Sequence, residues 1–200
     1  MSRKTYTNFI KPIGDYIVAI LLLALLGIPI LILWLIISIQ SGTNGFFMHE
    51  RIGQHGKKFK MYKLRSLQGE YSNSVTTEKT HQYLPIGKFL SYSKLDETPQ
   101  LLNILRGEMS FVGPRPDVAG YADQLEGDDH IILNVKPGIT GPAQIKYSRE
   151  AELLQQQPNP KKYNDEVLWP DKVQINKDYV KNQSFSQDLF YLLATIFPLQ

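Results

Sequence analysis

The residues best suited to chemistry are two adjacent acids, Asp96 and Glu97, in the segment SKLDETPQLLNIL. Proline is tolerated in the first turn of a helix, so Pro99 predicts a helix that begins near residues 96–98. Acids at a helix start are common capping residues, and this structural interpretation stays open. The functional interpretation is that the positive N-terminus of the helix keeps a carboxylate ionised and attracts phosphate.

The two acids also predict two separate roles. Neighbouring side chains on a helix diverge by about 100°, so Asp96 and Glu97 are not expected to share one proton. A better fit is that one carboxylate attacks an electrophile while the other holds a divalent cation through hard oxygen ligands.

Arg115 is the next candidate, in the segment GPRP at residues 113–116. Proline fixes its own backbone φ, so the two flanking prolines predict a stiff loop that presents the guanidinium with little entropy to lose. An ordinary surface turn is the alternative. The glycines of PGITG, residues 137–141, could bring backbone amides close to a ligand.

Several other kinds of site are excluded. The chain of 200 residues has no cysteine, which rules out a disulfide scaffold, a thiol nucleophile and a thiolate metal site. The four histidines are scattered without metal-ligand spacing. The sequence contains no Walker loop, dinucleotide fingerprint or nucleophile elbow.

The candidate residues follow a long apolar segment. Residues 16–39 include no charge over 24 positions, and only Gly27, Pro29 and Ser38 fall outside the hydrophobic set. As a helix this segment would reach about 36 Å, compared with a bilayer hydrocarbon core of about 30 Å. It is too long for a cleaved signal peptide and lacks a small-residue cleavage site after it, so an ordinary soluble enzyme is excluded.

Basic residues flank the apolar segment on both sides. Arg3, Lys4 and Lys11 precede it, and six more Lys/Arg residues follow between positions 51 and 65. Because basic flanks prefer the cytoplasmic side, both ends favour the same side of the membrane. Proline near the middle kinks a helix, so we favour a re-entrant hairpin over a straight span.

The basic residues are concentrated in the first third of the chain. Residues 1–65 carry nine Lys/Arg and two acids, a net charge of +7, whereas residues 66–200 carry thirteen and seventeen, a net charge of −4. This basic collar would attract anionic phospholipid headgroups and phosphate-bearing substrates, or it serves only to fix topology.

The remaining patterns predict an α+β fold that is mostly helical with little sheet. We expect a membrane-embedded segment at 1–45 and one compact cytosolic domain at 46–200. The expected elements are a loop at 40–45, a weak strand signal around residues 59–64, a loop at 68–82, a helical pattern at 84–105, irregular segments at 107–117 and 135–148, a short helix at 117–125, and tail helices at 171–182 and 186–197. The last helix is apolar enough to lie in the core or on a bilayer surface.

Five segments resemble, in order, the motifs of the bacterial sugar transferases, the monotopic phosphoglycosyl transferases. They are KPIGDYIVA, HERIGQHGKKFKMYKLRSL, KLDETPQLLNILRGEMSFVGPRP, VKPGITGPAQ and KDYVKNQSFSQDL. The resemblance covers residues 11–195. It implies transfer of a phospho-sugar from a UDP-sugar to undecaprenyl phosphate with release of UMP, in the first membrane step of bacterial glycan assembly. It also implies a re-entrant helix, amphipathic helices at the interface, and an active site on the cytoplasmic face of the inner membrane.

The resemblance implies roles for individual residues. Asp96 would be the covalent nucleophile on the β-phosphate, Glu97 would bind Mg²⁺, and Arg115 would contribute to nucleotide-sugar binding. Further substrate-binding positions would be Pro114, Lys63, Arg65, Lys94, Gln144 and Arg149. We expect membrane phospholipids and no nucleic acid among the partners, and the sequence leaves open whether the protein forms a homodimer.

The sequence departs from the family pattern at several positions. Ser91 stands where an arginine is usual; Lys94 would supply a charge there, but lysine is not a bidentate equivalent. The helix break reads Gly-Ile-Pro at 27–29 instead of Ser-Pro. Pro142 replaces a common tryptophan, and Arg149 is the nearest candidate for a displaced arginine. A non-catalytic, membrane-tethered relative that binds nucleotide sugar or scaffolds other enzymes is the alternative. A binding module for anionic lipid would explain the basic collar but not the LDE and GPRP segments.

Overall fold

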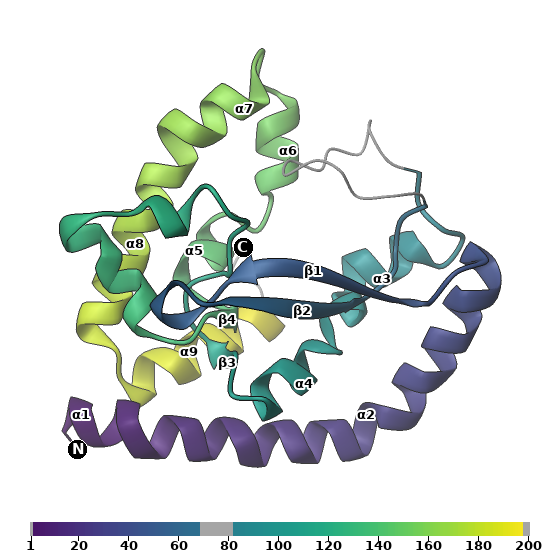
Figure 1. Ribbon diagram of the computed structural model, residues 1–200, viewed down its shortest axis with the longest axis horizontal. Helices are drawn as coiled ribbons and strands as arrows, with labels where there is room; N and C mark the ends of the chain where they lie inside the picture. The colour runs from purple at the N-terminus through teal and green to yellow at the C-terminus, as the bar shows by residue number, and fades with distance from the viewer. Residues whose placement is uncertain (1, 69–81, 198–200) are drawn as a thin grey trace.

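The computed structural model describes residues 2–68 and 82–197, so the predicted loop at 68–82 lies almost wholly outside the described residues. A long helix runs along the base of a smaller body and then turns up beside it (Figure 1). The body is mostly helical and contains two small sheets, which confirms the predicted fold class at this level. The long helix is α2, Lys11–Ser41, preceded by α1, Arg3–Thr5, and a π-helical turn, Tyr6–Ile10.

The helix Arg3–Ser41 is long and apolar enough to cross a membrane, and most of its apolar window is exposed. At 1.5 Å per residue its 39 residues would extend about 58 Å if straight, far more than the hydrocarbon core. Pro29 lies inside α2 and removes one helical hydrogen bond. Figure 1 shows α2 changing direction part-way along, as one bent helix with two arms. The re-entrant topology stays a prediction.

The predicted strand signal corresponds to an antiparallel hairpin of β1, Phe46–Ile52, and β2, Lys58–Leu64. Alternate residues of the hairpin share one face, and two of them, Phe59 and Met61, are buried in a core with Ala19 of α2 and Leu101. The apolar helix therefore packs against the same hairpin that carries much of the basic collar.

The helical pattern at 84–105 is interrupted. α3, Gly87–Ser93, ends because Lys94 adopts a left-handed conformation with φ of 58°. A 3₁₀ turn, Leu95–Glu97, follows, and α4, Gln100–Leu105, begins after Pro99. The prediction of a helix starting at 96–98 was therefore wrong by a few residues, and both acids lie on the 3₁₀ turn.

Two short strands lie in segments that we expected to be irregular. β3, Ser110–Val112, pairs in parallel with β4, Gly138–Thr140. The predicted helix at 117–125 was wrong, since only a 3₁₀ turn, Ala122–Gln124, forms there and Gly120 has a non-helical φ of 99°. A longer 3₁₀ segment, Gly127–Asn134, follows it.

The C-terminal third is helical. The two predicted tail helices are confirmed as α8, Trp169–Asn182, and α9, Phe185–Ile196. The short helices α5, Pro142–Lys146, α6, Glu150–Gln155, and α7, Pro160–Tyr163, precede them, with a π-helical turn, Asn164–Leu168, before α8. α9 exposes large apolar side chains, namely Phe185, Leu189, Phe190, Leu193 and Ile196.

Candidate active site

Asp96 and Glu97 meet two cations brought from other elements. The ammonium of Lys63, on β2, lies 2.9 Å from Glu97 Oε1 and 3.6 Å from Asp96 Oδ2. The guanidinium of Arg115, in the loop after β3, lies 3.1 Å from the same Glu97 oxygen. Both carboxylates are buried, whereas 44% of the Arg115 side chain is exposed. The two carboxylates and the two cations thus form one cluster with no net charge, and this cluster reaches the surface at Arg115.

Lys63 is held in register by a buried amide. Asn103 of α4 is fully buried, accepts a 3.0 Å hydrogen bond from the Tyr62 backbone N–H and donates a 2.8 Å bond to the Lys60 carbonyl. These bonds tie β2 to the helix that follows the two acids. Lys63 follows Tyr62 on β2, so these bonds keep its side chain facing the 3₁₀ turn that carries Asp96 and Glu97.

Arg115 is positioned by a close contact between two glycine-containing strand ends. The Gly113 N–H donates to the Thr140 carbonyl (2.9 Å), and the Gly138 N–H donates to the Pro114 carbonyl (2.8 Å). A Cβ on Gly138 would lie 2.1 Å from the Gly113 nitrogen, so only glycine permits this approach. The expectation that PGITG amides face a ligand was wrong for Gly138, whose amide supports the GPRP loop. Pro114 is buried in that loop.

Asp96 is a buried carboxylate that is only partly neutralised. Burial raises its pKa, the charge of Lys63 opposes that rise, and the charge of Glu97 adds to it. Its Oδ1 atom is buried and has no hydrogen-bond partner among the described residues. Burial therefore acts on Asp96 in the direction opposite to the ionising effect expected of a helix N-terminus. A poorly solvated carboxylate of this kind is suited to nucleophilic attack.

Glu97 has the opposite balance. Burial alone would raise its pKa, but the charges of Arg115 and Lys63 and their hydrogen bonds lower it well below the usual range. Glu97 is therefore ionised at all ordinary pH values. The two neighbouring acids differ in their environments, as the predicted separation of roles requires, although both approach Lys63.

The carboxylates of the site fit Mg²⁺ only if substrate phosphates complete its coordination. No group of three or more His, Cys, Asp or Glu side chains that could hold a metal occurs within residues 2–68 and 82–197. Mg²⁺ commonly binds one or two carboxylates together with substrate phosphates, so a full protein cage is not required. Within the described structure both ion pairs of Glu97 use Oε1, so its second oxygen, Oε2, could supply a hard ligand of that kind.

Among the other predicted substrate-binding residues, Lys94 and Gln144 have links to the site, whereas no contact joins Arg65 or Arg149 to the two acids in the described structure. Lys94 is exposed, and its charge lowers the pKa of Asp96 without forming an ion pair in the described structure. The Arg65 guanidinium donates to the Asn44 carbonyl (3.3 Å) and lies over the Phe47 ring. Gln144 donates to the Gly113 carbonyl (3.3 Å), behind the GPRP loop. Arg149 is exposed at the start of α6.

Sequence reasoning gave no site role to two charged residues next to Arg115. Burial and the charge of Arg115 lower the pKa of Arg51, at the end of β1, whereas the charges of Asp117 and Glu97 raise it. Burial raises the pKa of Asp117 to about 7, although Lys172, Arg51 and Arg115 oppose the rise. The alternation in HERIG could have indicated Arg51, because residues 47, 49 and 51 share the hairpin face of Lys63. No pattern in the sequence indicated that Asp117 is half-buried among charged residues.

The comparisons with known proteins agree on one family. The family model described as bacterial sugar transferase matches residues 6–199. The chain is 33% identical to the sugar transferase EpsL of Bacillus subtilis, over 94% of this chain and 85% of that protein. It is 27% identical to undecaprenyl-phosphate galactose phosphotransferase of Salmonella typhimurium and 30% identical to UDP-glucose:undecaprenyl-phosphate glucose-1-phosphate transferase of Escherichia coli, over 96% and 95% of this chain. The chain spans only about 40% of the length of these last two proteins, as it does for the UDP-galactose-lipid carrier transferase of Erwinia amylovora.

Proposed function

Because the chain belongs to the bacterial sugar transferase family, we propose that it is a phosphoglycosyl transferase that moves a sugar phosphate from a UDP-sugar to undecaprenyl phosphate and releases UMP. The names of several relatives support this donor and this acceptor. The observation that carries the proposal is Asp96, a buried carboxylate beside Lys63 with one oxygen that has no partner among the described residues.

The proposed reaction has two phosphoryl transfers at one site. An oxygen of Asp96 attacks the β-phosphorus of the donor, the bond from that phosphorus to the bridging oxygen breaks, and UMP leaves with the electron pair. An oxygen of undecaprenyl phosphate then attacks the aspartyl phosphosugar and restores the free carboxylate. The covalent intermediate lets a soluble donor and a lipid acceptor use the same residues in turn.

Charge neutralisation is the main task of the other residues. Both steps bring an anionic nucleophile to an anionic phosphate, so fixed positive charges lower the barrier. Lys63 touches both carboxylates, and Arg115 extends from Glu97 toward solvent, where a diphosphate would arrive. Bound Mg²⁺, held by Glu97 and the substrate phosphates, would add Lewis-acid stabilisation of the developing charge.

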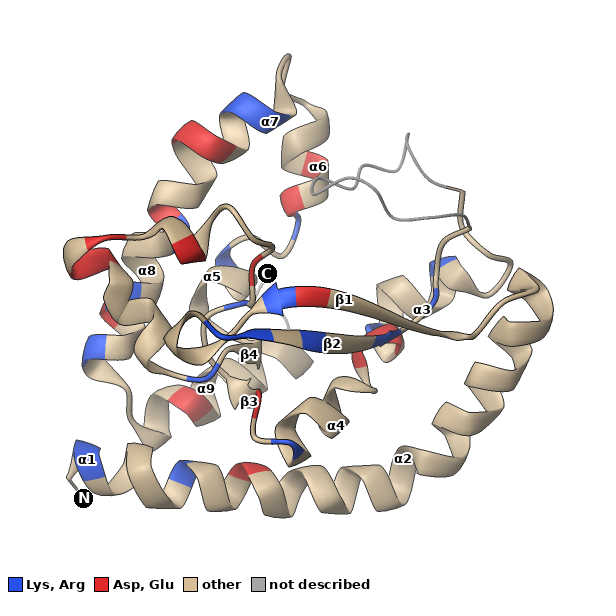
Figure 2. Cartoon of the chain, viewed as in Figure 1, with Lys and Arg blue, Asp and Glu red and all other residues tan. Residues whose placement is uncertain are grey.

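The membrane geometry belongs to the same proposal. α2 is apolar along most of its length, with charged residues only near its start (Figure 2). We place its bent helix in one leaflet as a re-entrant segment, with α9 on the headgroup region through its exposed apolar residues and the catalytic body on the cytoplasmic face of the inner membrane. Phospholipids would contact α2 and α9, and undecaprenyl phosphate would reach the site from the bilayer.

The alternative is a non-catalytic relative that binds nucleotide sugar. Ser91 favours it, because the family usually has an arginine at this position and serine cannot neutralise phosphate. The same turnover assay separates the two functions, since a binding relative would retain UDP-sugar without releasing UMP.

The direct test is UMP release by the purified protein with a panel of UDP-sugars and undecaprenyl phosphate. We expect turnover with at least one sugar, and a mass increment of one sugar phosphate on the intact protein when acceptor is omitted. Asp96→Asn should show neither, whereas Asp178→Asn, an exposed acid on α8, should retain both. Turnover without any increment at Asp96 would refute the covalent mechanism.

Glu97→Gln tests the metal proposal separately. The amide keeps the shape but loses the charge that would bind Mg²⁺, so we expect the Mg²⁺ concentration for half-maximal activity to rise about tenfold or more. An unchanged metal titration would remove Glu97 as the Mg²⁺ ligand.

A further inference from the structure

Arg51 occupies the same hairpin face as Lys63, at the far end of β1. In the register of the hairpin Phe47 lies opposite Lys63 and Arg51 lies opposite Phe59, so their side chains project from one side of the sheet. The Ile52 N–H donates to the Asp117 carbonyl (2.8 Å), which fixes this tip beside the GPRPD segment.

Arg51 lacks the partners that a partly buried guanidinium normally has. Its Nε atom is buried without a hydrogen-bond acceptor among the described residues, and one terminal nitrogen lies 3.3 Å from Nδ1 of His49. Over residues 2–68 and 82–197 it forms no salt bridge within 4 Å. Unsatisfied buried donors are rare in native proteins and call for an explanation such as a missing ligand.

The electrostatics of Arg51 indicate an excess of positive charge. Burial and the neighbouring charge of Arg115 lower the pKa of Arg51 to about 10, so the guanidinium is still charged at neutral pH. Asp117 does not fully offset it, because its own pKa of about 7 leaves it partly protonated there. Glu97 is already paired with Lys63 and Arg115. An anion between Arg51 and Arg115 would relieve the repulsion between the two guanidinium groups.

We infer that Arg51 binds the α-phosphate of the nucleotide donor, the phosphate that leaves as UMP. This assignment rests on the proposed function. Lys63 lies beside Asp96, where the β-phosphate would be attacked, and Arg115 pairs with Glu97 while its charge acts on Arg51. When the bond to the β-phosphorus breaks, the electron pair stays on the α-phosphate oxygen, and a guanidinium there stabilises the leaving group. The planar fork of arginine can hold two phosphate oxygens at once, which a lysine cannot do.

The test compares UMP with uridine as probes, because only UMP has the phosphate. We expect Arg51→Gln to weaken UMP binding at least tenfold in calorimetry and to leave uridine binding within twofold of wild type. Arg51→Lys should lie between Arg51→Gln and wild type for UMP. Lys60→Gln, on an exposed residue of β2 that projects from the opposite side of the hairpin, should bind both probes as wild type does.

Two results would overturn this assignment while leaving the proposed function intact. One is normal UMP binding by Arg51→Gln in a protein whose wild type releases UMP. The other is an equal loss of UMP and uridine binding, which would show that Arg51 supports the fold of the site and not the phosphate. If the wild type releases no UMP from any donor, the proposed function fails and the assignment fails with it.

Discussion

Two aspartates of this protein are buried to almost the same extent but are hydrogen-bonded very differently. Asp188 of α9 is 4% exposed and Asp96 is 5% exposed. The Oδ2 atom of Asp188 accepts hydrogen bonds from Tyr6 (2.5 Å) and Lys11 (2.6 Å), and its Oδ1 atom accepts one from Tyr179 (2.7 Å). Within the part of the chain that the structure describes, Asp96 has one 3.6 Å ion pair with Lys63 and one oxygen without a partner.

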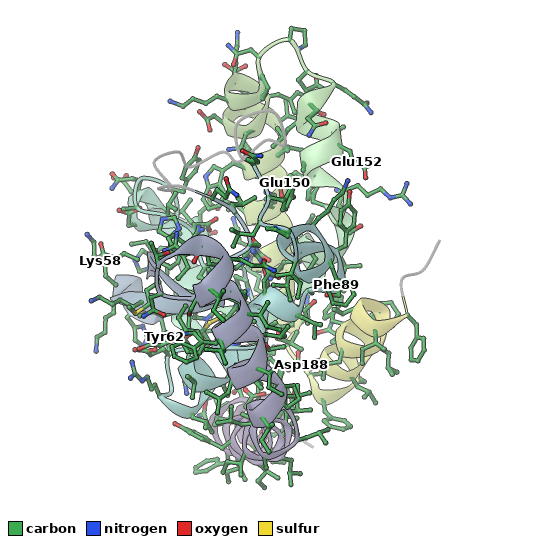
Figure 3. The ribbon with its side chains drawn as sticks, turned by 90° about the vertical axis from the view of Figure 1, so that its right-hand side faces the viewer. Lys58, Tyr62, Phe89, Glu150, Glu152 and Asp188 are labelled. Atoms are coloured by element: carbon green, nitrogen blue, oxygen red, sulfur yellow. The ribbon has the colours of Figure 1, made fainter. Side chains whose placement is uncertain are left out.

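The difference distinguishes a structural carboxylate from a reactive one. A buried acceptor without a donor destabilises a fold, so its presence in a native protein calls for an explanation such as a catalytic role. Asp188, labelled in Figure 3, joins α9 to the start of the long helix through its bonds to Tyr6 and Lys11. The Tyr179 hydroxyl also lies 3.2 Å from the Val112 carbonyl, so the same network reaches β3, the strand that precedes Arg115. The two acids thus support the site in different ways, one by anchoring and one by reacting.

The largest effect that would test this comparison is expected at Asp96. Asp96→Asn should lower UMP release by at least about 10³-fold, because the nucleophile is removed. Its melting temperature should be unchanged or higher, because a buried and poorly paired charge is lost. Thermal unfolding in detergent, measured beside the activity assay, checks both. A melting temperature several degrees below wild type would show that Asp96 is a structural acid like Asp188.

The reverse pattern is expected at Asp188. Asp188→Ala leaves the Lys11 ammonium and two tyrosine hydroxyls buried without their acceptor, a change that typically costs about 3–5 kcal/mol of stability. UMP release per folded molecule should fall far less than in Asp96→Asn. Asp178→Ala, on the exposed side of α8, is the matched control and should change stability by less than about 0.5 kcal/mol. Equal unfolding midpoints for the two variants would contradict the anchoring role.

A third carboxylate, Asp117, lies between these extremes and predicts a pH dependence. Its pKa of about 7 in the folded protein lies above the ordinary value of 3.8, so the folded state binds more protons between about pH 4 and 7. Stability should therefore fall as pH rises through this window and level off above it. The full shift would correspond to about 4 kcal/mol, but partial exposure of the side chain reduces the expected effect to about 1–2 kcal/mol.

Asp117→Asn isolates this contribution, because other groups titrate identically in both proteins. His49, whose pKa is lowered by burial and by nearby Arg51 and Lys63, contributes a pH dependence of opposite sign in wild type and variant alike. The change in melting temperature from pH 5 to pH 7.5 should therefore be more negative in wild type than in Asp117→Asn. The same difference in both proteins would show that Asp117 does not titrate in this window.

Elements with a long periodic pattern could be predicted from the sequence, and elements defined by distant contacts could not. The apolar helix, the hairpin and α8 and α9 each repeat their pattern over several turns or residue pairs. β3 and β4 have three residues each and meet across a long sequence separation, so no local signal indicates them. The prediction of a short helix at 117–125 was wrong because Gly120 has a positive φ, which depends on the local turn.

The candidate site shows the same difference between features that local patterns predict and features that distant contacts determine. The chemical types of Asp96, Glu97 and Arg115 are evident in their motifs, and the structure brings these three residues together with Lys63. The rise in the pKa of Asp96 was not predicted, because burial depends on tertiary packing and the local helix argument contains only neighbouring backbone dipoles. Arg51 and Asp117 stayed unnoticed for the same reason, since their environment is formed by segments more than 50 residues apart in the chain.

The smallest expected effect is at Lys94, where backbone and charge can be separated. A left-handed conformation at φ of 58° is unfavourable for lysine and natural for glycine at a helix end. Lys94→Gly should therefore stabilise the protein by about 0.5–1 kcal/mol, whereas Lys94→Ala keeps the strain and should not. Both variants remove the charge that lowers the pKa of Asp96. Because Lys94 is exposed, that charge is screened, and UMP release should change by less than about threefold in both. A large, equal loss of activity in the two variants would instead show that the Lys94 charge replaces the arginine missing at Ser91, and it would place Lys94 with Lys63 and Arg115 among the phosphate-binding cations.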